Sequence, residues 1–179
     1  MLTKANFLWV VRFPPGEDKT VGIEEKLPVG FLQETKGRGM IVHRWAPQVK
    51  ILSHPSVGAF VSHCGASGAM ESMYFGVPVI AMPMKFEQPL NTRLLVEVGV
   101  AVEVEKAENR SYYYSGEELA MAINKVILVE KEFGGAMRDR AKELSVKIKG
   151  RAPSEMNEVE QELVKICLMN KKNKCDVIL

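Results

Sequence analysis

Apolar residues occur in five short runs between positions 6 and 104, each closed by glycine, proline or a polar turn. The runs are nearly continuous and do not alternate with polar residues, which predicts strands of a parallel sheet covered on both faces. Amphipathic segments between the later runs predict helices. The predicted strands are 6–13, 40–43, 57–62, 77–82 and 100–104, and the predicted helices are 49–52, 67–75 and 89–98. This alternation indicates a doubly wound α/β domain with a parallel sheet.

Beyond a polar loop at 105–116, three further apolar stripes with helical spacing predict three more helical segments. They consist of Leu119, Ile123 and Val126, then Met137, Ala141, Leu144 and Ile148, and finally Met156, Val159, Leu163 and Ile166. Gly134-Gly135 is predicted to separate the first two segments, and a break at 150–153 the last two. We interpret all three stripes as core-facing. The predicted division is a domain at 1–150 and a C-terminal helix and tail at 151–179.

Charge and cysteine content exclude several classes of protein. With 24 basic and 22 acidic side chains, the net charge of +2 offers no long-range attraction for nucleic acid or an anionic membrane. The apolar runs are far shorter than the roughly 18 residues of a membrane span, and from the first residues we expect no signal peptide. Three widely spaced cysteines favour a reducing compartment. We expect a cytoplasmic protein with neither nucleic acid nor a membrane as its partner.

The candidate chemistry lies in the turn after the strand predicted at 57–62. Small residues dominate this turn, which reads His63-Cys64-Gly65-Ala66-Ser67-Gly68. At the carboxyl end of a parallel strand, such a turn aims backbone N–H groups and a helix N-terminus at an anion, typically a phosphate. A tight connection without a ligand explains the same residues equally well. Glu71 also has two interpretations, a helix cap in a box that starts at Gly68 or an acceptor for ribose hydroxyls.

Other kinds of site have weaker support in the sequence. No G-x-G-x-x-G follows a predicted strand and no G-x-x-x-x-G-K-[ST] occurs, so the sequence disfavours a dinucleotide-binding dehydrogenase and a P-loop protein. The G-x-S-x-G elbow of a serine hydrolase is also missing. His54, His63 and Cys64 lack paired ligand spacing, so we predict no metal site.

A longer pattern joins this turn to residues on both sides of it. Its members, in order, are Trp45-Ala46-Pro47-Gln48, Ile51-Leu52, His54, His63-Cys64-Gly65, Glu71, Gly76-Val77-Pro78, Pro83 and Gln88. In order and spacing this segment of 44 residues resembles the signature box of the plant UDP-dependent glycosyltransferases, which act in secondary metabolism, and the flanks 6–12 and 98–104 are similar to the same family. The resemblance implies a Rossmann-like domain, the C-terminal half of a GT-B fold.

The resemblance also implies which residues bind a UDP-sugar. Those implied to bind UDP are Trp45, Ala46, Gln48, His63, Gly65, Ser67, Gly68 and Glu71, and those implied to bind the sugar are Ala66, Glu87 and Gln88. The indole of Trp45 would stack on uracil, Gln48 and Glu71 would bond the ribose, and His63 would hold the diphosphate. The UDP-sugar is a co-substrate, so neither a cofactor nor a metal is implied.

Two parts of the box depart from the family pattern. Ala66-Ser67-Gly68 stands where the family usually has Trp-Asn-Ser or Trp-Ser-Ser, and Glu87 stands in place of aspartate. A lost hydrogen bond to a charged group is worth about 1.5–3 kcal/mol. We therefore expect the missing hydroxyl at Gly68 to weaken donor binding on the order of tenfold or more.

By resemblance, the activity is transfer of a sugar, most often glucose, with inversion from a UDP-sugar to a small-molecule acceptor such as a terpenoid or flavonoid glycoside. The family carries its general base in an N-terminal domain, so we expect no catalytic residue in these 179 residues and no activity from this chain alone. The strand that opens the family's C-terminal domain, central in the order 3-2-1-4-5-6, is also expected to be missing. The alternative is a truncated or degenerate nucleotide-binding domain without catalysis.

Overall fold

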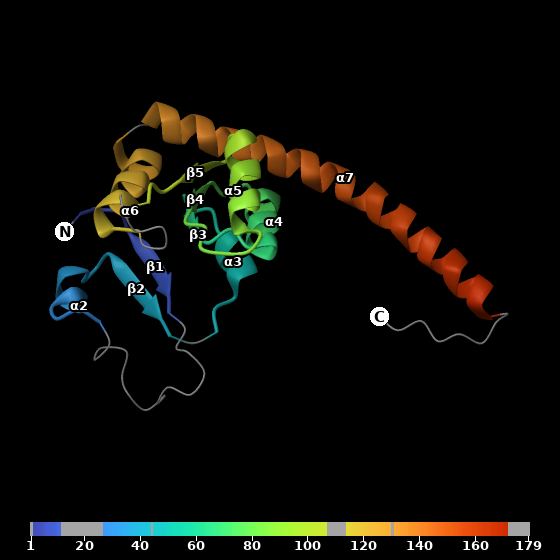
Figure 1. The fold of residues 1–179 in the computed structure, drawn as a ribbon, viewed down its shortest axis with the longest axis horizontal. Coiled ribbons are helices and arrows are strands. Elements are labelled where there is room, and N and C mark those ends of the chain that lie inside the picture. Colours follow the sequence, from blue (N-terminus) through green and yellow to red (C-terminus); the bar gives the residue numbers. More distant parts are fainter. Residues whose placement is uncertain (1, 12–26, 44, 107–113, 130, 172–179) are drawn as a thin grey trace.

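The computed structural model describes residues 2–11, 27–43, 45–106, 114–129 and 131–171. Within them the strands form two groups, and every pairing is parallel (Figure 1). The first group consists of β1 (Phe7–Val10) and β2 (Gly39–Val42), and the second of β3 (Phe60–Ser62), β4 (Val79–Ala81) and β5 (Ala101–Glu103), with β4 in the middle. The predicted parallel α/β architecture is confirmed.

Each predicted strand overlaps an observed one. Four of the observed strands are shorter than predicted, whereas β2 has the predicted length but begins one residue earlier. β4 begins after Pro78, because proline has no N–H to donate to a ladder. The Pro78 carbonyl still accepts from Phe60 N–H at 2.8 Å, so Pro78 takes part in the pairing with β3 as an acceptor only. Residues 12 and 13 of the first predicted strand lie outside the described part of the chain.

Helices connect the strands and follow the last one. They are α2 (Phe31–Glu34), α3 (Gln48–Leu52), α4 (Ala66–Phe75), α5 (Gln88–Glu97), α6 (Gly116–Ile123), the π-helical η1 (Asn124–Val129) and α7 (Lys131–Lys171). α4 ends at Phe75 and is followed by Gly76, whose left-handed φ of 68° favours glycine. α6 begins with a capping box, in which Ser115 and Glu118 each bond the backbone of the other.

Both faces of the sheet formed by β3, β4 and β5 are covered. Val79 and Ala81 point to one face, where they pack in a cluster with Leu95 of α5 and Ala141 of α7. The intervening Ile80 points to the other face, where its cluster consists of Val104, Ala122, Val126 and Met137. Burial on both faces explains why the strand sequences read as continuous apolar runs.

Among the described residues, no ladder joins the two strand groups. One ladder pairs β1 with β2 and the other runs β3-β4-β5, and among the described residues no strand fills the gap between β1 and β3. That the family's central strand is missing there stays a prediction. The N–H groups of Phe7 and Val11 donate toward β2, and that of Phe60 donates toward β4. Because backbone groups alternate in direction along a strand, those of Leu8 and Val61 point away from these partners and toward the gap. Both side chains are 43% exposed.

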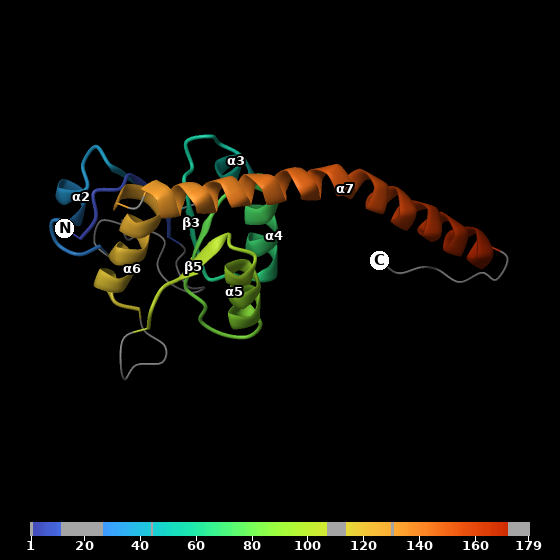
Figure 2. The same cartoon turned by 90° about the horizontal axis from the view of Figure 1, so that it is seen from above.

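α7 differs from the sequence prediction in two ways. It is one helix from Lys131 to Lys171, so the break predicted at 150–153 is wrong. A proline removes one helical hydrogen bond and can bend a helix without ending it, and Figure 2 shows α7 curving in its second half. The glycines at 134 and 135 are not a separator either, because they lie inside α7.

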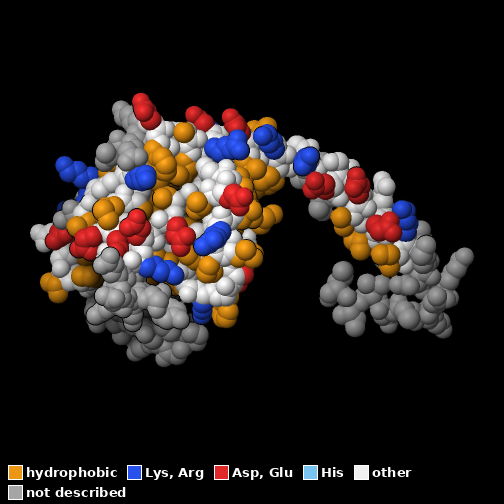
Figure 3. Space-filling model, turned by 45° about the horizontal axis from the view of Figure 1, so that its top comes forward, with side chains coloured by type: hydrophobic (Ala, Val, Ile, Leu, Met, Phe, Trp, Pro, Cys, Tyr) orange, Lys and Arg blue, Asp and Glu red, His pale blue; other side chains and the backbone are white. Residues whose placement is uncertain are grey.

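The stripes predicted to face the core have different outcomes. In the first two, Val126, Met137 and Ala141 are buried, as expected. The last stripe is not in the core, since Val159, Leu163 and Ile166 are 43–54% exposed. This end of α7 projects beyond the sheet, and Figure 3 shows apolar side chains along it. A stripe shows which face of a helix is apolar, but not whether another element covers that face.

Gly134 is required by a close approach and not by a turn. A Cβ at this position would overlap the carbonyl oxygen of Val126 in η1, whereas a Cβ on Gly135 would meet nothing within 4 Å. The start of α7 can therefore pack on η1 only if position 134 carries no side chain.

We expect Gly134→Ala to lower the free energy of unfolding by about 1–3 kcal/mol, the usual cost of overpacking a tight site. The matched control is Gly135→Ala, which should raise it by up to about 1 kcal/mol because alanine is the better helix former. Urea denaturation of both variants measures the difference. Equal effects of the two substitutions would contradict the close approach.

Candidate functional site

The predicted phosphate turn lies where β3 ends and α4 begins. His63 is exposed, and a Cβ on Gly65 would lie 2.8 Å from its Nε2 atom, so the imidazole rests against the glycine at the helix N-terminus. No side chain caps α4 at Gly65. The first backbone N–H groups of a helix have no intrahelical partner. Together with the imidazole of His63 they form a concentration of donors suited to an anion.

Hydrogen bonds with two side chains that the sequence did not indicate, Asn91 and Ser62, hold the turn. Asn91 Nδ2 donates to the Cys64 carbonyl at 2.9 Å, and Cys64 N–H donates to Ser62 Oγ at 3.1 Å. Burial raises the pKa of the Cys64 thiol, so it stays protonated at neutral pH. Asn91 lies three residues after Gln88 on α5, and this helical spacing was a signal that could have identified it.

The two predicted ribose residues lie together. Gln48, the first residue of α3, donates from Nε2 to Glu71 Oε2 on α4 at 2.8 Å. The capping interpretation of Glu71 is wrong, because α4 begins after Gly65 and Glu71 lies well past the first turn. The carboxylate therefore remains available as an acceptor near the turn.

Trp45 lies three residues before α3. Its side chain is 79% exposed, although tryptophan is a large apolar residue, whereas the adjacent Ala46 is buried. An exposed indole offers a flat apolar surface to an aromatic base.

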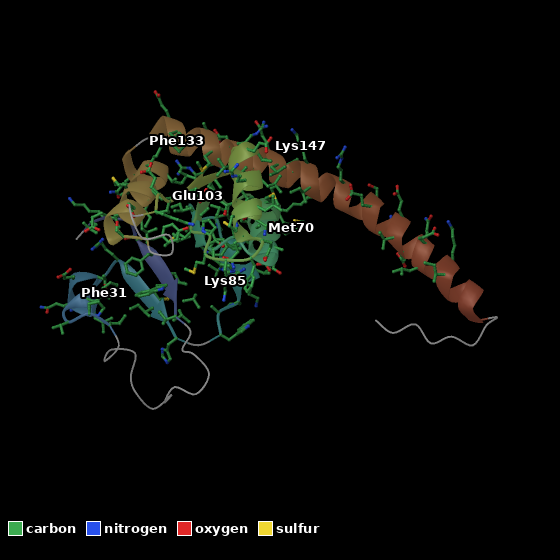
Figure 4. The ribbon with its side chains drawn as sticks, in the orientation of Figure 1. Phe31, Met70, Lys85, Glu103, Phe133 and Lys147 are labelled. Atoms are coloured by element: carbon green, nitrogen blue, oxygen red, sulfur yellow. The ribbon has the colours of Figure 1, made fainter. Side chains whose placement is uncertain are left out.

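Two of the three predicted sugar residues, Glu87 and Gln88, lie where the loop after β4 meets α5, and Figure 4 labels Lys85 on this loop. Glu87 is exposed at the start of α5. Gln88 is buried, and its Oε1 accepts from the N–H groups of Met84 and Lys85 at 2.9 and 3.0 Å. Its amide oxygen thus orders the loop, and its Nε2 has no partner among the described residues. This capping role was not predicted.

Of the residues that depart from the family pattern in the first turn of α4, Ala66 and Ser67 are exposed. A Cβ on Gly68 would lie 3.5 Å from Ser62 Oγ and 4.0 Å from Gln48 Nε2, which is ordinary contact. Position 68 therefore has room for a serine beside Gln48.

Neither a metal cluster nor a membrane helix is found in the described ranges. No three His, Cys, Asp or Glu side chains there are placed to hold a metal ion. Within the same ranges, no helix is both long enough and apolar enough to cross a bilayer.

Known proteins are similar in sequence to this chain over most of its length. The sequence model of a family described as UDP-glucoronosyl and UDP-glucosyl transferase matches residues 24–139. UDP-glucosyltransferase 29 of Panax ginseng is 47% identical over 170 residues, which cover 95% of this chain and 36% of that protein. A beta-D-glucosyl crocetin beta-1,6-glucosyltransferase of Gardenia jasminoides is 44% identical over 167 residues, covering 92% and 36%. The chain spans about a third of the length of these curated relatives.

A solved structure agrees with the sequence matches. Phytolacca americana UGT2, complexed with UDP-2fluoro-glucose and pterostilbene, superposes with a TM-score of 0.73 at 34% identity, over 88% of this chain and 34% of that one. The fold is therefore a Rossmann-like domain of the GT-B type. The chain belongs to the family of UDP-glucuronosyl and UDP-glucosyl transferases, among its plant members, as the signature box predicted.

Proposed function

We propose that this chain is the UDP-sugar-binding part of an inverting glycosyltransferase that moves glucose from UDP-glucose to a small-molecule acceptor already bearing a sugar. The observation that carries the proposal is that the Gln48–Glu71 pair lies beside the first turn of α4, which follows the His63 turn, with the exposed Trp45 three residues before Gln48. These groups match a ribose, a diphosphate and a base in that order. The acceptor class is supported by the Gardenia relative, whose name specifies a glucosyl crocetin.

In such a transfer, the acceptor oxygen attacks the anomeric carbon from the face opposite the diphosphate. The bond from that carbon to the diphosphate oxygen breaks, and negative charge grows on UDP. The free N–H groups at the start of α4, together with the helix dipole and the His63 ring, would stabilise that charge. Glu87 and the Gln88 amide would orient the sugar hydroxyls. The base that removes the acceptor proton is expected from an N-terminal domain, as the family resemblance implies.

We expect the chain to show no turnover alone and measurable turnover when it is fused behind the N-terminal domain of a related plant glycosyltransferase. The assay uses UDP-glucose with a panel of terpenoid and flavonoid glycosides. A fusion in which the general base of the added domain is replaced by alanine serves as the control.

A second fusion carries Ala66→Trp and Gly68→Ser, since position 68 has room for the serine. Turnover only in this fusion would identify the natural chain as a degenerate binding domain, the alternative reading. Turnover in neither fusion would contradict the proposed function.

A further inference from the structure

The loop from Pro83 to Glu87 is attached at its first residue to a side chain far away in the sequence. Tyr114 Oη donates to the Pro83 carbonyl oxygen at 2.7 Å. Pro83 is fully buried, and the Tyr114 ring packs against the cluster that contains Ile80 and Val126. The start of the loop is thereby connected to the face of the sheet that α6 and η1 cover.

The rest of the loop needs such support. Phe86 has a φ of 57°, in the left-handed region that residues other than glycine rarely adopt, and its side chain is 80% exposed. A residue in this conformation persists only where its surroundings determine it. The Gln88 side chain bonds Met84 and Lys85 from one end, and Tyr114 holds the other.

The Tyr114 hydroxyl is suited to a permanent donor role. Burial, together with the negative charge of Glu103 and the neighbouring Cys64, raises the pKa of Tyr114 to about 12. The hydroxyl therefore keeps its proton at neutral pH. Glu103, at the end of β5, and Lys85, on the loop, are both labelled in Figure 4.

We propose that Tyr114 is a positioning residue for the donor sugar, whose hydroxyl holds the Pro83–Glu87 loop so that Glu87 and the Gln88 amide meet the sugar hydroxyls. The inference rests on the proposed function. The groups assigned to UDP lie on α3, α4 and the adjacent turns, and none of them is bonded to Tyr114. Loss of the Tyr114 hydrogen bond should therefore weaken binding of the sugar and not of the nucleotide.

Tyr114→Phe in the 179-residue chain removes only the hydroxyl oxygen. Calorimetry should show UDP-glucose binding weakened about fivefold, as expected for one lost hydrogen bond, and UDP binding changed less than about twofold. The matched control is Tyr74→Phe on α4, whose hydroxyl has no hydrogen bond among the described residues, and it should change neither affinity. An equal effect of Tyr114→Phe on both ligands, or no effect on either, would overturn the proposal.

Hydrogen exchange of the ligand-free chain separates this inference from the proposed function. Tyr114→Phe should accelerate exchange at the amides of Met84 and Lys85 and leave the β4 amides unchanged. Unchanged exchange in the loop, or equal acceleration in β4, would contradict the role of Tyr114. Failure of the wild-type chain to bind UDP would instead contradict the proposed function.

Discussion

In chemical denaturation followed by circular dichroism, the 179-residue chain is expected to unfold with a free energy below about 5 kcal/mol, the low end for ordinary domains, and light scattering should show self-association. The reason is the gap between β1 and β3. Leu8, Trp9 and Val61 are each more than 40% exposed, so the chain lacks the stabilisation that burial of this apolar surface would provide. Exposed apolar edges also pair with other chains.

Adding one apolar strand and its following helix from a related glycosyltransferase should raise the free energy of unfolding by about 3 kcal/mol or more and suppress the association. The control is the same added segment with two prolines in its strand, which cannot complete a central ladder. A monomeric 179-residue chain with one cooperative transition well above about 5 kcal/mol would show that the open edges carry no such cost.

We expect Glu71→Ala to weaken UDP binding about tenfold, because the ribose loses a charged acceptor worth roughly 1.5–3 kcal/mol. Its effect on stability should be under about 0.5 kcal/mol, since the Gln48–Glu71 bond is exposed and Glu71 caps no helix. Calorimetry measures the first quantity and denaturation the second.

The control for Glu71→Ala is Glu97→Ala, which removes an exposed carboxylate at the far end of α5. This variant should leave UDP affinity unchanged. Unaltered affinity in Glu71→Ala itself would exclude the ribose role.

The sequence predicted features of the fold that depend on local pattern. Apolar runs located every strand that the structure describes, and the helix predicted to end at residue 75 ends there. The continuity of α7 through residue 153 was missed, because whether a proline ends or bends a helix depends on the packing around it. The exposure of Val159 and Leu163 was missed for a related reason, since hydrophobicity does not indicate whether a partner is present.

In the site too, the residues that a sequence pattern marks were predicted, and the contacts that depend on tertiary structure were not. The signature box indicated Gln48 and Glu71 together, and the structure brings them to 2.8 Å. The bond from Tyr114 to Pro83 joins residues separated by 31 positions, so no local pattern could reveal it. The double acceptance by Gln88 depends on the backbone course of the loop, which is fixed by tertiary structure.

The division of the strands into two groups also affects how a nucleotide binds. Trp45 follows β2 in one group, whereas His63 follows β3 in the other. A UDP molecule held by both would act as a cross-link between the groups, and part of its contact free energy would be used to fix their relative position. The apparent affinity would then be lower than the contacts alone suggest, and saturating UDP would stabilise the fold in proportion to its concentration over Kd.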